Sequence, residues 1–379
     1  MLTTKSDASA FGAKALAWPS LAGHGRATSA NMDVPTGAPF AFNRYYPRSS
    51  RHVMQPSPLL AIAIVFCLVA SIAQAQPPTP RFKLVKKSVA YREVDGHQIL
   101  ADVYRPAGDE VRPVIVWIHG GALIMGSRTS IHPQVRRLAE EKGYAVVSID
   151  YRLAPETKLP ELISDIEAAF RWLAADGGKQ FHLNANRTVV AGGSAGGYLT
   201  LVTGYRAKPQ PKALVALYGY GDLNGEWYSK PSPHPRHNPR VISRQDAEAQ
   251  TNGTVISDAR QRKGNGGIIY LYYRQNGIWP ARVSGFGPST IAEQIAEFEP
   301  VRHVTKEYPP TLLIHGTRDT DVPFVQSTMM AEQLKKHGVP HQLAPIENGE
   351  HGFGGGDRKQ IDAAYKTMRE FIVKHLDGE

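Results

Sequence analysis

From Phe82 onward, short apolar runs alternate with longer segments in which apolar residues recur every three or four positions. The apolar runs are continuous, which is typical of strands that are buried on both faces of a sheet. The clearest are PVIVWIHG (113–120), AVVSID (145–150), RTVVAGG (187–193), ALVALYGY (213–220) and TLLIHG (311–316). In PELISDIEAAFRWLAA (160–175), the apolar residues instead follow one face of a helix. This alternation predicts an α/β fold with a mainly parallel sheet covered by helices on both sides.

Other segments follow the same two patterns. SVAYREV (88–94) and HQILADVYR (97–105) flank Asp95-Gly96, and Asp-Gly between two such runs predicts a β-hairpin. We expect the further elements to be helices near 131–142, 195–205, 324–337 and 358–376, and a strand at 341–346.

The alternation is interrupted over roughly 221–300, where the composition changes. Prolines in YSKPSPHPRHNPR (228–240) predict an extended loop. An insertion of this size within a compact domain is usually functional, so we expect a cap over the mouth of the sheet. Its aromatic residues either line an acyl or alcohol pocket or pack the cap onto the core: Tyr270, Tyr272, Tyr273 and Trp279.

The first 75 residues have a different character from the rest. Arginines precede the apolar run LLAIAIVFCLVA (59–70), and Ala73 and Ala75 follow it as an A-x-A site. This order predicts a secretory signal peptide at 54–75 that is cleaved after Ala75. The run is short for a bilayer span, and an N-terminal membrane anchor is the alternative.

Residues 1–53 show neither helical nor strand periodicity. They are interpreted as a disordered extension, or as sequence upstream of a true start at Met32 or Met54. The folded domain is therefore expected over 76–379, in a secreted or periplasmic protein without stable membrane insertion once the signal is removed.

Composition narrows the possible partners. The net charge is +10, but the basic residues of the mature chain are scattered without an aromatic-interleaved stripe, which argues against a nucleic-acid partner. The single cysteine, Cys67, lies inside the predicted signal, so the mature chain would contain no disulfide. The histidines lack metal-ligand spacing, and we expect neither a metal nor a cofactor.

The run VVAGGSAGGYLTLV (189–202) puts four glycines around one serine between a predicted strand and a predicted helix. Gly192, Ser194 and Gly196 form G-x-S-x-G, the pattern of a nucleophile on a tight strand-to-helix turn. A phosphate-binding loop is the alternative, but it would require G-x-G-x-x-G or G-x-x-x-x-G-K-[ST]. The glycines fit neither spacing, and Ser194 is the candidate nucleophile.

A serine nucleophile needs a base, and the base needs an acid that orients it. In one known hydrolase arrangement these groups follow the order Ser, Asp or Glu, His, each after a strand. The loop after 311–316 offers Asp319 and Asp321, and the loop after 341–346 offers His351. The order predicts a catalytic triad and leaves the choice between the two aspartates open.

An oxyanion hole is also required, because the tetrahedral intermediate carries negative charge on the former carbonyl oxygen. The loop after the strand at 113–120 supplies candidate backbone donors at Gly120 and Gly121, with Ala122 as a possible further one. The Ala195 amide, next to the nucleophile, completes the predicted set. We expect His119 to fix this loop by hydrogen bonding, since it lies at the wrong strand end to be the base.

Five motifs together resemble the α/β-hydrolase superfamily, specifically the hormone-sensitive-lipase-like bacterial carboxylesterases. They are HGGALIMGS (119–127), DYRLAPE (150–156), GGSAGG (192–197), HGTRDTDVP (315–323) and EHGF (350–353). The resemblance covers residues 85–375. It implies an α/β-hydrolase fold: a mostly parallel central sheet flanked by helices, with a cap insertion.

The resemblance also implies roles for single residues: Ser194 as nucleophile and His351 as general acid and base. The 315–323 loop is similar to H-G-x-x-D-x-x-V-P of the prolyl-oligopeptidase family, whose acid matches Asp319 rather than Asp321. There are two departures. The oxyanion motif is H-G-G-A instead of H-G-G-G, and Gly193 stands where many relatives have Asp. Four residues of 150–156 are expected to buttress the oxyanion loop: Asp150, Tyr151, Arg152 and Glu156.

The sequence thus predicts a serine carboxylic-ester hydrolase that acts through an acyl-enzyme on small to medium acyl esters. An amide or peptide hydrolase is one alternative, suggested by the Asp319 loop. A hydrolase-fold binding protein without activity is another.

Overall fold

The computed structural model describes residues 81–251 and 253–378, so the predicted extension and signal peptide lie outside the described residues. Within them, a single sheet has eight strands. The strands are β1 (Leu84–Val94), β2 (His97–Pro106), β3 (Arg112–Ile118), β4 (Ala145–Ile149), β5 (Leu183–Gly193), β6 (Ala213–Leu217), β7 (Thr311–Gly316) and β8 (His341–Ile346).

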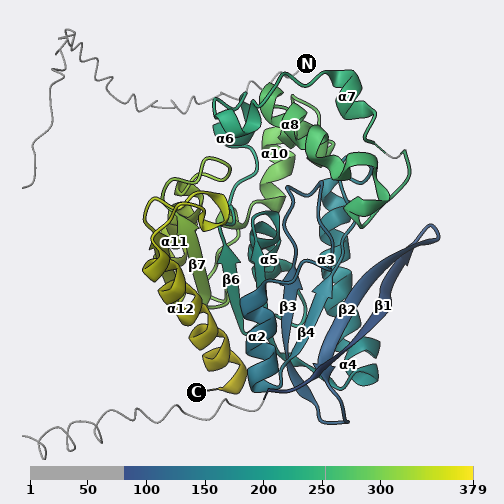
Figure 1. Ribbon diagram of the computed structural model, residues 1–379, viewed down its shortest axis with the longest axis vertical. Coiled ribbons are helices and arrows are strands. Elements are labelled where there is room, and N and C mark those ends of the chain that lie inside the picture. Colours follow the sequence, from purple (N-terminus) through teal and green to yellow (C-terminus); the bar gives the residue numbers. More distant parts are fainter. Residues whose placement is uncertain (1–80, 252, 379) are drawn as a thin grey trace, which may run out of the picture. The chain divides into compact units, whose positions relative to one another are not determined.

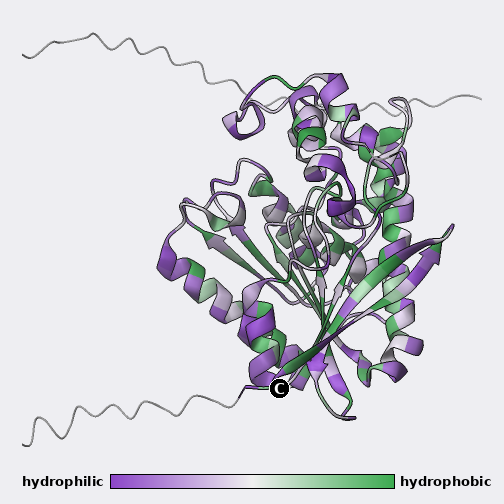
Figure 2. Ribbon diagram, turned by 45° about the vertical axis from the view of Figure 1, so that its right-hand side comes forward, coloured by the Kyte–Doolittle hydropathy of each residue, from purple (hydrophilic) through white to green (hydrophobic). Residues whose placement is uncertain are grey.

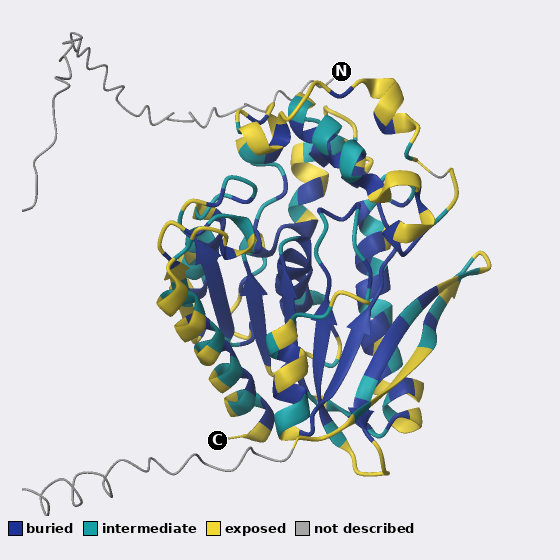
Figure 3. Ribbon diagram, in the orientation of Figure 1, coloured by how far each residue is buried: buried dark blue, intermediate teal, exposed yellow. Residues whose placement is uncertain are grey.

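The strand order is β1-β2-β4-β3-β5-β6-β7-β8. β1 and β2 form the expected antiparallel hairpin, and β2 is also antiparallel to β4. All strand pairs from β4 to β8 are parallel. The predicted α/β class with a mostly parallel sheet is therefore confirmed. β4 and β6 are buried along their whole length and β3 is buried from Pro113 onward (Figure 3), as their continuous apolar runs indicated.

Eleven α-helices accompany the sheet in the described part of the chain. They are α2 (Pro133–Lys142), α3 (Leu159–Ala174), α4 (Asp176–Gln180), α5 (Ala195–Arg206), α6 (Glu226–Ser229), α7 (Arg244–Glu248), α8 (Gly267–Asn276), α9 (Trp279–Ser284), α10 (Ile291–Gln294), α11 (Val325–Lys336) and α12 (Arg358–Asp377).

The two faces of the sheet carry separate cores. On one face, α2 and α12 pack against the strands through Leu138, Met368 and Ile372. On the other face, α3, α5 and α11 supply a larger core. Figure 2 shows the result, with apolar strands inside and helices that are apolar on one side and polar on the other. Amphipathic helices over buried strands are what the two sequence periodicities predicted.

The predicted cap forms helices α6 to α10, and the helices labelled α6, α7 and α8 gather at one end of the sheet (Figure 1). The proline-rich segment 228–240 is not one extended loop, as predicted, because it contains the end of α6 and a 3-10 turn at Pro235–His237. Pro235 is the first residue of that turn, where the missing N–H costs no hydrogen bond.

Several strand boundaries also differ from prediction, and β1 begins at Leu84, four residues before the predicted start. β5 begins at Leu183, four residues before the predicted start. β6 ends at Leu217 instead of residue 220, because Tyr218 has a positive φ of 39° that ends the strand. Among the described residues, no helix combines the length and apolar character needed to cross a membrane.

Candidate active site

Ser194 occupies the turn between β5 and α5, with φ 56° and ψ −124°. The turn packs so closely against the surrounding backbone that positions 192 and 196 have no room for a side chain. A Cβ on Gly192 would lie 2.3 Å from the carbonyl oxygen of Gly196, and one on Gly196 would lie 2.1 Å from that of Ile118. The glycines of G-x-S-x-G therefore permit a turn that presents the Ser194 hydroxyl at the start of α5, where the helix dipole favours negative charge.

The structure brings the predicted triad residues together. His351 Nε2 lies 3.0 Å from Ser194 Oγ, and His351 Nδ1 lies 2.7 Å from Asp319 Oδ2. Ser194 follows β5, Asp319 follows β7 and His351 follows β8, so three parallel strands deliver the three groups to one edge of the sheet. A hydroxyl, an imidazole and a carboxylate in this order can transfer a proton from the hydroxyl while the carboxylate stabilises the imidazolium that forms.

Asp319 is held by donors on both carboxylate oxygens. Oδ1 accepts hydrogen bonds from the backbone amides of Asp321 and Val322, at 2.8 and 2.9 Å. His315, which the sequence analysis did not single out, lies buried beside Oδ2 at 3.2 Å. Burial alone would raise the pKa of Asp319, but the hydrogen bonds from His315 and His351 outweigh it and lower the pKa to about 2. The carboxylate is therefore charged over the whole neutral range.

This depressed pKa predicts a specific loss of stability in acid. The folded pKa lies below the ordinary value of 3.8, so the contribution of Asp319 is complete above about pH 4 and is lost as the pH falls towards 2. Between pH 5 and 3, we expect the free energy of unfolding to fall by about 1 kcal/mol more in the wild type than in Asp319→Asn. Urea denaturation at both pH values measures the difference, and parallel pH profiles would contradict it.

Asp321, the other candidate acid, lies on the opposite side of the imidazole ring. Its Oδ2 is 3.7 Å from His351 Nε2, whereas the Nδ1 atom faces Asp319. An orienting acid must bind the nitrogen that does not face the nucleophile. The geometry thus favours Asp319 for that role, as the family resemblance implied.

The loop after β3 packs directly against the nucleophile turn. A Cβ on Gly120 would lie 2.6 Å from the carbonyl oxygen of Gly193, and Gly121 has φ 116°, which only glycine adopts readily. Within the described part of the chain, no group accepts a hydrogen bond from the amides of Gly120 and Gly121. The Ala195 amide begins α5 and has no helical acceptor. All three predicted oxyanion donors remain available to a ligand.

His119 contacts this loop and the residue that supports it. Its Nδ1 atom lies 2.8 Å from the carbonyl oxygen of Gly120, and its ring stacks on Tyr151 at 4.4 Å between ring centres. Burial lowers the pKa of His119 to about 4, so the ring is neutral at physiological pH. Trp279 of the cap donates from Nε1 to the carbonyl oxygen of Ala122 at 3.1 Å. Tyr151 and the cap residue Trp279 thus both donate hydrogen bonds to backbone carbonyl oxygens of this loop.

The segment 150–156 supports the oxyanion loop through hydrogen bonds and buried ion pairs. The hydroxyl of Tyr151 donates to the carbonyl oxygen of His119 at 3.1 Å. Asp150 and Arg152 form buried ion pairs with Arg128 and Asp165, respectively. Glu156 pairs with Arg262, which also donates to the carbonyl oxygens of Ile124 and Ala154.

A cavity of about 640 Å³ borders Ser194 and His351. Of the four cap aromatics, Tyr270 lines this cavity, whereas Trp279 is fully buried, and Tyr272 and Tyr273 line a separate hollow. Tyr218 also lines the cavity, and its ring meets His351 edge to face at 4.8 Å. Burial raises the pKa of Tyr218 to about 12, so it is a neutral hydrogen-bond donor.

Tyr218 was not predicted from the sequence as a site residue, although its place near the end of a predicted strand was a usable signal. A Cβ on Gly193 would lie 3.0 Å from the Tyr218 hydroxyl oxygen. Tyr218 therefore fills the space that an acidic side chain at position 193 would need. Among residues 81–251 and 253–378, no group of three or more His, Cys, Asp or Glu side chains is arranged to hold a metal ion.

Comparisons with known proteins agree with this geometry at the level of the fold. A sequence model for the α/β-hydrolase fold matches residues 115–303, and one for the prolyl oligopeptidase family matches residues 267–379. Butyrate-bound esterase 2 of Thermogutta terrifontis is a similar solved structure, with a TM-score of 0.54 and 23% identity over 79% of this chain and 95% of that one. A protein of unknown function from Staphylococcus aureus subsp. aureus Mu50 has a TM-score of 0.61 and 22% identity, over 77% and 99%.

The curated relatives are much longer proteins. The 5-methylorsellinic acid synthase of Aspergillus terreus is 28% identical over 366 residues, which cover 81% of this chain and 14% of the synthase. The non-reducing polyketide synthase ausA of Aspergillus calidoustus is also 28% identical, over 84% of this chain and 15% of its own length. The chain thus spans about one seventh of these relatives. By its fold and its two family matches, the chain belongs to the α/β-hydrolase superfamily.

Proposed function

We propose that the protein is a serine carboxylic-ester hydrolase that acts through an acyl-enzyme on small to medium acyl esters. One observation carries this proposal: the hydrogen-bonded line from Ser194 through His351 to Asp319 ends at a cavity. The same cavity is bordered by the amides of Gly120 and Gly121, which have no acceptor in the described part of the chain. A nucleophile, a base and free donors at one point are the parts that acyl transfer needs.

In the proposed reaction, His351 Nε2 takes the proton of Ser194 as the hydroxyl oxygen attacks the ester carbonyl carbon. The tetrahedral oxyanion is bound by the amides of Gly120, Gly121 and Ala195. His351 then gives the proton to the alkoxide leaving group, and the acyl group stays on Ser194. A water molecule, deprotonated by His351, releases the acid and restores the serine.

Amide or peptide hydrolysis is the second candidate, favoured by the match of residues 267–379 to the prolyl oligopeptidase family. The same machinery attacks an amide carbonyl, so the leaving group decides between the two. Kinetics with nitrophenyl acetate, butyrate and decanoate, against aminoacyl nitroanilides, separate them. We expect the short and medium esters to be turned over with the higher kcat/KM. A preference for the anilides would overturn the esterase proposal, and failure of a fluorophosphonate to label the folded protein would favour an inactive binding protein.

A further inference from the structure

The active-site cavity continues beneath the cap. A second hollow of about 500 Å³ shares Met125, Tyr270 and Asp321 with the cavity that borders Ser194. Its other walls include Arg236 and His237 of the cap. A substrate bound at Ser194 therefore has room to extend toward Asp321, and the mechanism derived above gives this aspartate no role.

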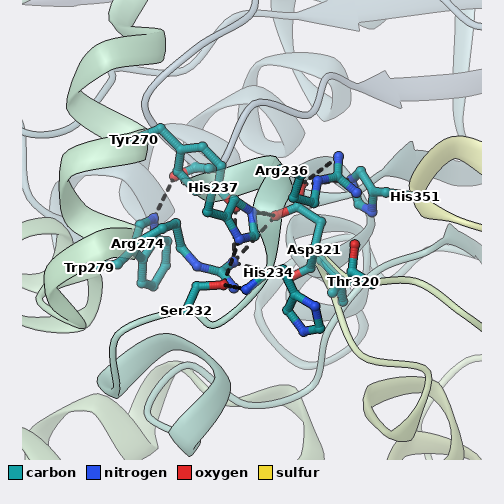
Figure 4. A network of polar contacts seen from close by, with 12 residues as sticks. Ser232, His234, Arg236, His237, Tyr270, Arg274, Trp279, Thr320, Asp321 and His351 are labelled. Carbon is teal, nitrogen blue, oxygen red and sulfur yellow. Dashed lines mark hydrogen bonds and ion pairs between the residues drawn. The ribbon is translucent and has the colours of Figure 1, made fainter. Parts of the chain in front are cut away.

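The two carboxylate oxygens of Asp321 have different surroundings (Figure 4). Three cap donors converge on Oδ1: the hydroxyl of Tyr270, His237 Nε2 at 2.9 Å and Arg274 Nη1 at 3.3 Å. Within the described part of the chain, Oδ2 accepts no hydrogen bond. Its nearest cationic or imidazole nitrogens are those of Arg236 at 3.6 Å and His351 at 3.7 Å. Oδ1 thus binds the cap, whereas Oδ2, which faces Arg236 and His351, accepts no hydrogen bond from the described residues.

Asp321 Oδ2 lies close to the nitrogen that would protonate the leaving group. His351 Nε2 is the atom that protonates the leaving alkoxide, and Asp321 Oδ2 is 3.7 Å from that nitrogen. The alcohol half of an ester must therefore pass close to Asp321 when the acyl-enzyme forms. A hydroxyl on the carbon next to the leaving oxygen would come within reach of Oδ2.

The surrounding charges favour a neutral donor over a cation. Arg274 and Arg236 both neighbour the carboxylate of Asp321, and Arg236 also pairs with Glu350 at 2.7 Å. Burial would raise the pKa of Asp321, but the hydrogen bond from His237 and the positive charges nearby hold it well below its usual range. The carboxylate is therefore ionised, yet its charge is largely offset by the arginines, so an ammonium group gains little there.

We propose that Asp321 is a specificity-determining residue that accepts a hydrogen bond from a hydroxyl adjacent to the leaving oxygen, so that the site prefers esters of polyhydroxy alcohols. This proposal rests on the proposed esterase function and names its class of alcohol. A hydrogen bond to a charged acceptor is worth enough to favour such an ester by about tenfold over one whose alcohol lacks the hydroxyl.

The test compares 1-butyrylglycerol with propyl butyrate, which share the acyl group and a three-carbon primary alcohol. In the wild type, we expect kcat/KM to be about tenfold higher for the glyceryl ester. In Asp321→Asn, the three donors at Oδ1 retain the amide oxygen there and turn the NH₂ group toward the cavity. The charged acceptor becomes a neutral donor, whose hydrogen bond to the hydroxyl oxygen is weaker, and we expect the ratio of the two kcat/KM values to fall several-fold.

Ser232→Ala is the matched control. Ser232 Oγ lies 2.7 Å from His237 Nδ1, so its loss loosens the fastening of the cap to Oδ1 without touching Oδ2. The ratio should stay at its wild-type value in this variant. A ratio near one in the wild type, or an equal fall of the ratio in both variants, would overturn the proposal while leaving the esterase function intact. If neither ester is hydrolysed, the esterase proposal itself fails, and this one fails with it.

A measurement on the wild type alone covers the case in which Asp321→Asn does not fold. Transfer of the butyryl group from the acyl-enzyme to an added alcohol is the reverse of acylation, so it uses the same contacts. With glycerol and 1-propanol at equal concentration, we expect butyryl transfer to glycerol to exceed transfer to propanol by about tenfold. Equal transfer to both alcohols would contradict the role of Asp321.

Discussion

Replacing Ser194 by alanine is expected to lower kcat for nitrophenyl butyrate by about 10⁶-fold, with the fold intact. The hydroxyl is the only protein group in the proposed reaction that forms a bond to the acyl carbon, and His351 cannot replace it. What activity remains would come from the oxyanion donors and from substrate binding alone. The methyl group of alanine is smaller than the serine side chain, so the turn between β5 and α5 should be retained.

The measurement pairs steady-state kinetics with labelling by a fluorophosphonate. The wild type should be labelled at a single residue, and Ser194→Ala should not be labelled. Ser229→Ala, on the exposed face of α6, is a matched serine control that should be labelled like the wild type. Labelling that persists in Ser194→Ala would show that another residue is the nucleophile.

Asp319→Asn should lower kcat by about 10⁴-fold. The carboxylate oxygen Oδ2 accepts the Nδ1–H of His351 at 2.7 Å, which leaves Nε2 unprotonated and facing Ser194. An asparagine can present an NH₂ group to Nδ1 instead. The proton would then sit on Nε2, where it prevents the imidazole from acting as a base. The negative charge that stabilises the imidazolium would also be lost.

Asp321→Asn provides the comparison for this prediction, with nitrophenyl butyrate as the substrate because its leaving group has no adjacent hydroxyl. Asp321 faces Nε2 instead of Nδ1, so its loss cannot change the tautomer through the orienting hydrogen bond. We expect a much smaller decrease in kcat than in Asp319→Asn. The reverse order of the two losses would identify Asp321 as the orienting acid.

Local pattern predicted most of the hydrolase core. The continuous apolar runs of β3, β6 and β7 and the amphipathic spacing of α3 correspond to elements at nearly the expected positions. These segments agree with the sequence because burial of both sheet faces leaves little freedom in the choice of residue type. The cap was harder to predict, since its short helices are held by contacts distant in sequence, such as that of Trp279 with Ala122.

The same distinction applies to the candidate site, where residues marked by a local pattern were predicted and residues placed by packing were not. Ser194, His351 and Asp319 were found because each follows a parallel strand in a short loop, and parallel strands bring such loops to one edge. Tyr218 and His315 were missed, although both stand at the ends of predicted strands. Their proximity to His351 and Asp319 depends on the backbone turn at Tyr218 and on the packing of β7, neither of which leaves a pattern along the chain.

The sequence by itself determined the α/β layering, the strand-to-helix turn at Ser194 and a shortlist of partners for it, because each depends on residue type at short separation. Only the tertiary structure decided what the two neighbouring aspartates contact. Asp319 turns toward the two histidines that follow or end strands, whereas Asp321, two residues later, turns toward the cap and the cavity. The physical reason is that the chain bends at residues 320–322, so side chains two residues apart do not share a face as they would in a strand.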